Sequence, residues 1–143
     1  MGGYRHVLLA VDFEPGHEKV VARAADICQR YHSRLTLLHV VEPAPVDVST
    51  DSLPALAPQL EQEYLDAARR RLSAVRKRTG LHDVDELVRL GHTKREILHQ
   101  ASALGADLIV IGCHGRHGLA LLLGSTANAV LHGTPCDVLA VRI

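Results

Sequence analysis

Apolar residues along the chain gather in short runs, and the segments between these runs carry apolar residues at helical spacing. The runs predict five strands, namely His6 to Val11, Arg34 to Val41, Val84 to Leu90, Asp107 to Gly112 and Val138 to Ile143. Most of these runs are apolar at nearly every position, as is typical of strands buried on both faces of a parallel sheet. The third run is the most polar, and we therefore expect it near a sheet edge.

Four helices are expected between the strands, because their apolar residues recur every three to four positions. The predicted helices are Glu18 to Tyr31, Gln59 to Thr79, a helix from Thr93 to Gly105, and Ser125 to about Leu131. One face of the second helix is expected to be buried, and it collects Leu60, Tyr64, Ala68, Leu72 and Val75. The third helix begins with a capping-box pattern, in which the oxygen of Thr93 and the carboxylate of Glu96 satisfy exposed backbone N–H groups.

Strands that alternate with helices predict right-handed βαβ units. The expected fold class is therefore α/β, with an open, doubly wound, five-stranded parallel sheet and helices on both faces. A length of 143 residues fits one domain over residues 1–143. Aromatic residues make up only 3% of the chain, so the core must be built from aliphatic side chains.

The charge balance excludes some classes of partner. Lys plus Arg and Asp plus Glu number 16 each, whereas a nucleic-acid groove needs a one-sided positive field. The longest apolar runs, Val7 to Val11 and Leu119 to Leu123, are too short to span a bilayer. We therefore expect neither a nucleic-acid partner nor a membrane partner.

Cysteine usage predicts the compartment. The chain has three cysteines, Cys28, Cys113 and Cys136, and no CxxC pair. A sparse, odd number fits reduced thiols in the cytoplasm better than a disulfide framework.

Two segments at predicted strand ends carry candidate binding chemistry. In an open parallel sheet, ligands bind beyond the carboxyl ends of the strands where the strand order reverses. Asp12 follows the first strand, and Gly112-Cys113-His114-Gly115 follows the fourth. Glycines at 112 and 115 let backbone amides approach an anion, and Gly124-Ser125-Thr126 opens a helix whose N-terminus favours phosphate.

The individual signals leave alternatives open. Asp12 either binds a ribose hydroxyl or an adenine amine, or it only caps a turn. The backbone of Val40, near the end of the second strand, is placed to meet an adenine edge. A lone GxxG is as typical of a turn as of a binding loop.

Motifs of other nucleotide sites and of several enzyme classes are absent. The chain lacks GxGxxG, GxxxxGK[ST], GxSxG and HExxH. His114 and His117 are spaced to share a metal ion but have no evident third ligand, so we expect no metal site. His39 is expected to be hydrogen-bonded inside its strand, and His6 to lie near the surface.

The last strand suggests self-association. Val138 to Ile143 is apolar at every position except Arg142. If it lies at the sheet edge, its unpaired backbone groups are a template for a second copy of the same strand. The alternative is a strand covered within its own chain.

The chain resembles the universal stress protein family over essentially its whole length. The resemblance rests on the opening strand with Asp12-Phe13, on Leu37-Leu38-His39-Val40, and on the block from Asp107 to Val141. The family's nucleotide motif is G-x2-G-x9-G-[ST], which Gly112, Gly115 and Gly124-Ser125 match. Between Gly115 and Gly124, however, lie eight residues where the family has nine.

This resemblance implies a fold of the adenine nucleotide alpha hydrolase-like type with strand order 3-2-1-4-5, and homodimers paired through Val138 to Ile143. It also implies an adenine nucleotide, ATP or AMP, with Mg²⁺ in addition if the ligand is a triphosphate. The residues that it places around the nucleotide are Ala10, Val11, Asp12, Val40, Gly112, Gly115, Arg116, Gly124, Ser125 and Thr126.

The leading functional hypothesis is a nucleotide-binding stress or regulatory module. The alternatives are a dimeric interaction module that binds no nucleotide, favoured by the shortened spacing, and a slow ATP hydrolase. Hydrolysis needs a group that positions water near the γ-phosphate. His114 and His117 are the only nearby candidates, and neither has an evident partner, so no catalytic residue is assigned.

Overall fold

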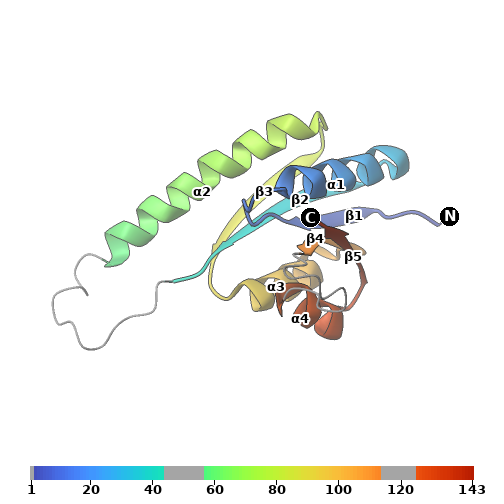
Figure 1. Cartoon of the computed structure of the whole chain (residues 1–143). Coiled ribbons are helices and arrows are strands. Elements are labelled where there is room, and N and C mark those ends of the chain that lie inside the picture. Colours follow the sequence, from blue (N-terminus) through green and yellow to red (C-terminus); the bar gives the residue numbers. More distant parts are fainter. Residues whose placement is uncertain (1, 44–56, 114–124) are drawn as a thin grey trace.

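A computed structural model describes residues 2–43, 57–113 and 125–143 (Figure 1). Its strands are β1 (His6–Ala10), β2 (Arg34–Val41), β3 (Val84–Leu90), β4 (Leu108–Cys113) and β5 (Asp137–Arg142). They form one sheet in the order β3-β2-β1-β4-β5, and every pair is parallel. The predicted fold class and strand order are therefore confirmed, with β3 at one edge and β5 at the other.

Helices cover both faces of this sheet. They are α1 (His17–Tyr31), α2 (Ala57–Thr79), α3 (Thr93–Leu104) and α4 (Ser125–Gly133). Buried apolar residues of α1 and α2 belong to one cluster, and those of α3 and α4 belong to a second cluster. Successive strand residues enter these clusters alternately, because neighbouring side chains of a strand point to opposite faces. Among the described residues, no helix is both long enough and apolar enough to cross a membrane.

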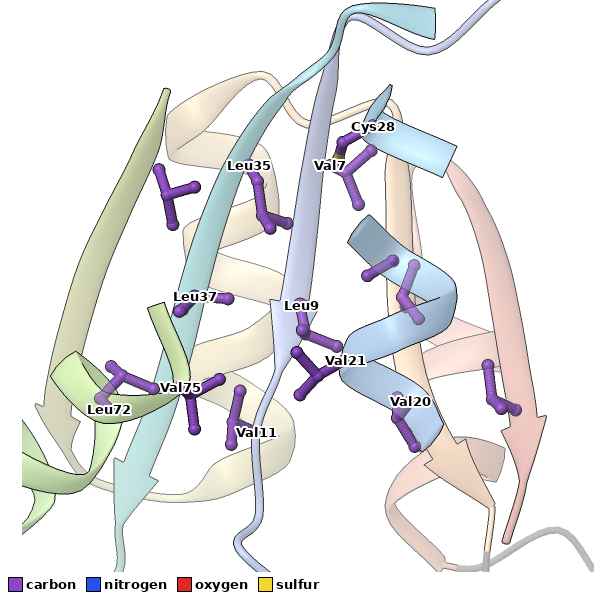
Figure 2. Close-up of a cluster of buried hydrophobic side chains, with 14 of the residues drawn as sticks. Val7, Leu9, Val11, Val20, Val21, Cys28, Leu35, Leu37, Leu72 and Val75 are labelled. Atoms are coloured by element: carbon purple, nitrogen blue, oxygen red, sulfur yellow. The ribbon is translucent and has the colours of Figure 1, made fainter. Parts of the chain in front are cut away.

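Aliphatic side chains dominate the cluster under α1 and α2, as Figure 2 shows. Leu9, Leu35, Leu37 and Leu72 are each 0% exposed. With so few aromatic residues in the chain, interdigitated Leu and Val side chains supply most of the buried apolar area that stabilises the fold.

The predicted buried face of α2 is correct only for its second half. Ala68, Leu72 and Val75 are buried, whereas Leu60 is 45% exposed and Tyr64 is 61% exposed. The reason is length: 23 helical residues span about 34 Å, whereas a seven-residue strand such as β3 spans about 23 Å. The first turns of α2 therefore extend beyond the sheet (Figure 1).

The predicted capping box at the start of α3 is wrong. The N-cap is His92, and it makes no side-chain capping bond. Thr93 is instead the first helical residue, and both its backbone N–H and its hydroxyl donate to Oε1 of Glu42. The acceptor at the start of α3 is thus the carboxylate of Glu42, which follows β2, and not a side chain of α3 as the sequence pattern predicted.

The expectation that His6 lies near the surface is also wrong. His6 is 9% exposed, and its Nε2 lies 2.7 Å from Oγ1 of Thr36 on the neighbouring strand. Its backbone N–H donates to Asp107, whose carboxylate also accepts from the N–H of Arg5. This polar cluster stands at the amino-terminal end of the sheet, opposite to the end where ligands bind in folds of this kind.

Candidate functional site

A cavity of about 550 Å³ opens at the carboxyl end of the sheet. Its volume is within the range of small-molecule pockets. Its lining residues come from the ends of β1, β2 and β4 and from the starts of α3 and α4, and they are Ala10, Val11, Asp12, Glu14, Leu38, His39, Val40, Glu42, Thr93, Ile97, Ile111, Gly112, Ser125, Thr126 and Ala127.

The topology explains why the cavity forms there. β1 lies between β2 and β4. From β1 the chain continues through β2 to the edge strand β3, and it then returns to β4 and continues to the opposite edge strand β5. A crevice at this crossover is the usual ligand site of a doubly wound sheet. The apolar residues of its wall include Leu38, Val40, Ile97, Ile111 and Ala127, which form a surface suited to the flat face of a base.

Asp12 stands at the mouth of the cavity, directly after β1. Its Oδ1 accepts a hydrogen bond of 3.0 Å from the backbone N–H of Glu14. This is the turn-capping role that the sequence left open as an alternative. A role in ligand binding remains a prediction, which its exposed position on the cavity wall permits.

A column of side chains supports this loop from the α1/α2 side of the sheet. His39 donates through Nδ1 to the carbonyl of Val11 at 2.6 Å, so the expectation of a hydrogen-bonded His39 is confirmed. The ring of Phe13 lies 4.4 Å from the ring of His39, and the guanidinium of Arg71 lies 4.2 Å from the centre of the Phe13 ring. Burial, together with the charge of Arg71, lowers the pKa of His39. The imidazole is therefore neutral at pH 7, with its proton on the nitrogen that faces Val11.

The N-terminus of α4 forms the opposite wall. Ser125, Thr126 and Ala127 are its first three residues, and all three line the cavity. Backbone N–H groups in a first helical turn have no acceptor within the helix. Together with the helix dipole, they make this wall a favourable place for an anion.

The N-terminus of α3 lines the same cavity but already holds a negative group. Oε1 of Glu42 accepts from the Thr93 backbone N–H at 3.2 Å and from its hydroxyl at 2.9 Å. These two bonds, the backbone one first, hold the pKa of Glu42 below its ordinary value. In the described part of the chain, no group of three or more His, Cys, Asp or Glu side chains is arranged to hold a metal ion.

Seven of the ten predicted site residues line this cavity, namely Ala10, Val11, Asp12, Val40, Gly112, Ser125 and Thr126. The other three, Gly115, Arg116 and Gly124, lie outside the described residues, as do His114 and His117. The fold thus brings the described candidates together, and their role in binding stays a prediction.

Gly112 has a packing role that the motif did not indicate. A Cβ at this position would lie 3.0 Å from Cδ1 of Ile143 and 3.3 Å from Cγ2 of Val20. Both neighbours belong to the α1 side of the sheet. Close packing on that side therefore favours glycine here, whatever the cavity holds.

Sequence reasoning missed several lining residues, among them Glu14, Glu42 and Thr93. Glu42 could have been predicted in the same way as Asp12, because it also directly follows a strand and ligands bind beyond the carboxyl ends of strands. Thr93 was noticed only as a capping residue of its own helix, and its contact with Glu42 joins positions 51 residues apart.

An open parallel sheet with a cavity at its strand crossover and a helix N-terminus in the cavity wall defines the class of doubly wound α/β ligand-binding domains. The comparison with protein families narrows this class. The universal stress protein family matches residues 3–142, and the chain belongs to that family.

Relatives of known sequence and structure agree with this assignment. Universal stress protein A homolog 2 of Coxiella burnetii is 38% identical over 100% of this chain and 98% of its own length. The solved universal stress protein UspA of Lactobacillus plantarum is 28% identical, with a TM-score of 0.74 over 99% of this chain and 100% of that protein. The fold is the adenine nucleotide alpha hydrolase-like fold of universal stress protein structures.

Two further solved relatives were determined with a nucleotide. One is a universal stress protein in complex with cAMP, with a TM-score of 0.69, 24% identity, and coverage of 98% of each chain. The other is the universal stress protein of Archaeoglobus fulgidus in complex with dAMP, with a TM-score of 0.60, 22% identity, and coverage of 96% of this chain and 98% of that one. At these identities the likeness shows the shared fold.

Proposed function

We propose that this protein is an adenine-nucleotide-binding stress-response or regulatory module that acts as a homodimer. The observation that carries the proposal is the cavity at the β1/β4 crossover, which combines an apolar wall with the N-terminus of α4. The apolar wall suits a base, Asp12 suits a hydroxyl or amine donor, and Ser125 and Thr126 suit a phosphate. Relatives of the same fold with bound cAMP and dAMP give further support.

The resident ligand is expected to be ATP or AMP, with Mg²⁺ only if the phosphate chain is long enough to chelate it. The three cysteines, of which none forms a disulfide, suit a reducing compartment, and we place the protein in the cytoplasm on that ground.

Nucleotide binding is tested by ligand release and by thermal stability. We expect mass spectrometry of the denatured protein to detect a released adenine nucleotide. Ligand-free protein should be stabilised by about 2.7 kcal/mol when the nucleotide is present at 100 times its Kd. For a domain of this size, that corresponds to a rise in Tm of roughly 5–10 °C.

A matched pair of variants at Ser125 locates the phosphate. Ser125→Pro keeps α4, because proline is favoured at the first helical position, but it removes one N–H and the hydroxyl. We expect it to weaken AMP binding about tenfold or more, since hydrogen bonds to a charged group are worth roughly 1.5–3 kcal/mol. Ser125→Ala, which keeps the N–H, should lose less. If Ser125→Pro binds AMP as the parent does, the phosphate does not sit at α4.

Dimerisation is proposed through the edge strand β5. Val138, Leu139 and Ala140 are only half-buried there, although they are apolar. An edge strand of this kind is a template for a second strand. A symmetric pair of β5 strands would cover the exposed apolar edges of both copies.

Sedimentation experiments test this dimer with the same substitution on two strands. The parent is expected to sediment at twice the mass of the chain. Leu139→Lys on β5 should give monomers, because a charge on an edge strand prevents edge-to-edge pairing. Leu90→Lys on β3, where the leucine is 40% exposed, should leave the dimer intact. Monomers in the parent, or in both variants, would contradict a dimer through β5.

A further inference from the structure

The two helix N-termini that face the cavity differ in their electrostatic state. The first backbone N–H of α3, at Thr93, is bonded to the carboxylate of Glu42, and the Thr93 hydroxyl is bonded to the same oxygen. Among the described lining residues, those at the start of α4 are Ser125, Thr126 and Ala127, which are uncharged. At α3, the carboxylate of Glu42 already compensates the helix dipole, so an anion in the cavity gains little there. At α4, none of the described lining residues at the helix N-terminus carries a carboxylate, so the dipole still favours an anion.

The other charges of the cavity lining reinforce this difference. Three carboxylates line it, those of Asp12, Glu14 and Glu42, and all three follow β1 or β2. The described lining contains neither Lys nor Arg. The β1/β2/α3 side of the cavity is therefore negative, and the described lining residues on its α4 side are uncharged. Hydrogen-bond donors such as amines and hydroxyls are favoured on the negative side.

We propose that Glu42 is a specificity-determining residue, which orients the nucleotide with its phosphate at α4 and rejects ligands that carry a negative group at the base end. This inference rests on the proposed function, since it assigns a direction to a nucleotide in the same cavity. The Oε1 atom of Glu42 occupies the anion position at the N-terminus of α3. The charge of Glu42 therefore faces the part of the ligand that lies between β2 and α3.

Two observations explain how Glu42 keeps this role. Its bonds to Thr93 further favour the ionised carboxylate, since the backbone N–H and then the hydroxyl lower the pKa of Glu42. The same two bonds tie the side chain to the start of α3, so that it does not swing away when a ligand enters. Because Glu42 is exposed at the cavity mouth, solvent screens its charge, and the expected discrimination is several-fold.

A pair of AMP analogues of nearly equal size tests the proposal. One carries a 2-carboxyethyl group on the exocyclic amine of adenine, and the other carries an uncharged 2-carbamoylethyl group there. Calorimetry should show that the parent binds the uncharged analogue about five to ten times more tightly than the charged one. In Glu42→Gln, whose amide oxygen still accepts from Thr93, this ratio should fall by at least half, and the charges of Asp12 and Glu14 account for the discrimination that remains.

Matched controls separate the charge of Glu42 from general charge effects. Glu63→Gln makes the same change on the exposed surface of α2, outside the cavity lining, and should leave the ratio unchanged. Ser125→Pro should weaken AMP relative to adenosine and should not alter the ratio of the two analogues. Glu42→Gln should change the affinities for AMP and adenosine by the same factor, within twofold.

The outcomes distinguish this proposal from the proposed function. If the parent binds AMP but does not discriminate between the analogues, Glu42 does not set specificity, although the protein is still a nucleotide-binding module. If Glu42→Gln strengthens AMP fivefold or more relative to adenosine, the phosphate lies beside Glu42 and the proposed orientation is reversed. If the parent binds neither AMP nor ATP, the proposed function fails and the role of Glu42 fails with it.

Discussion

Replacing Leu72 by alanine is expected to lower the free energy of unfolding by about 2–5 kcal/mol, the usual cost of removing a large side chain from a packed core. Leu72 is 0% exposed and lies where α2 packs on β2 and β3 (Figure 2). Because domains of this kind are stable by only about 5–15 kcal/mol in total, this one change removes a large share. Urea denaturation measures it as a lower midpoint at an unchanged m-value.

The control is the same substitution 12 positions earlier in the same helix. Leu60 is 45% exposed, and Leu60→Ala should change the free energy of unfolding by no more than about 0.5 kcal/mol. Leucine and alanine have similar helix propensities, so the comparison isolates packing. Equal losses at both positions would mean that α2 is buried along its whole length, contrary to this structure.

The contrast between Leu60 and Leu72 also shows what a periodic pattern reports. Helical spacing identifies the face of α2 that points toward a core, and it was correct for that face. It holds no information about where the sheet beneath the helix ends, because that depends on the length and register of strands elsewhere in the chain. The five strands were predictable from their apolar runs, whereas their order in the sheet came from the family resemblance.

The site was predictable where it follows from strand ends. Asp12 and Val40 were found because parallel strands bring their carboxyl ends to one edge. The pairing of Glu42 with Thr93 was not found, since it depends on the end of β2 lying beside the start of α3. Phe13 is a second example: its φ of +58° is rare for a residue with a bulky side chain, and nothing in the sequence indicated it.

The C-terminal residue and the loop of the candidate site are connected through Gly16. This glycine caps α1 with a φ of 93°, four residues after Asp12. An added Cβ would overlap Cγ2 of Ile143. The backbone of Ile143 is held by a 3.1 Å bond from its N–H to the carbonyl of Cys113. Its side chain also packs within reach of Gly112, so it has little freedom to move aside.

Gly16→Ala is therefore expected to lower the free energy of unfolding by about 2–4 kcal/mol, which combines the left-handed backbone penalty with overpacking. For a domain of this size, thermal unfolding should show a loss of roughly 5–15 °C in Tm. Gly80→Ala separates the two causes, because Gly80 has a φ of +69° but no atom within 4 Å of an added Cβ. It should cost only about 1–2 kcal/mol.

A double-mutant cycle assigns the remaining loss in Gly16→Ala to one contact. Ile143→Ala removes the Cγ2 atom that a Cβ at position 16 would overlap, so the double variant should be more stable than the sum of the single losses by about 1 kcal/mol or more. If Gly16→Ala costs no more than Gly80→Ala, or if the two changes are additive, Ile143 does not pack on the cap of α1. A measured coupling would instead establish that Ile143, which follows the proposed dimer strand β5, packs against the loop that carries Asp12. Dimer formation and the geometry of the candidate nucleotide site would then share one structural contact.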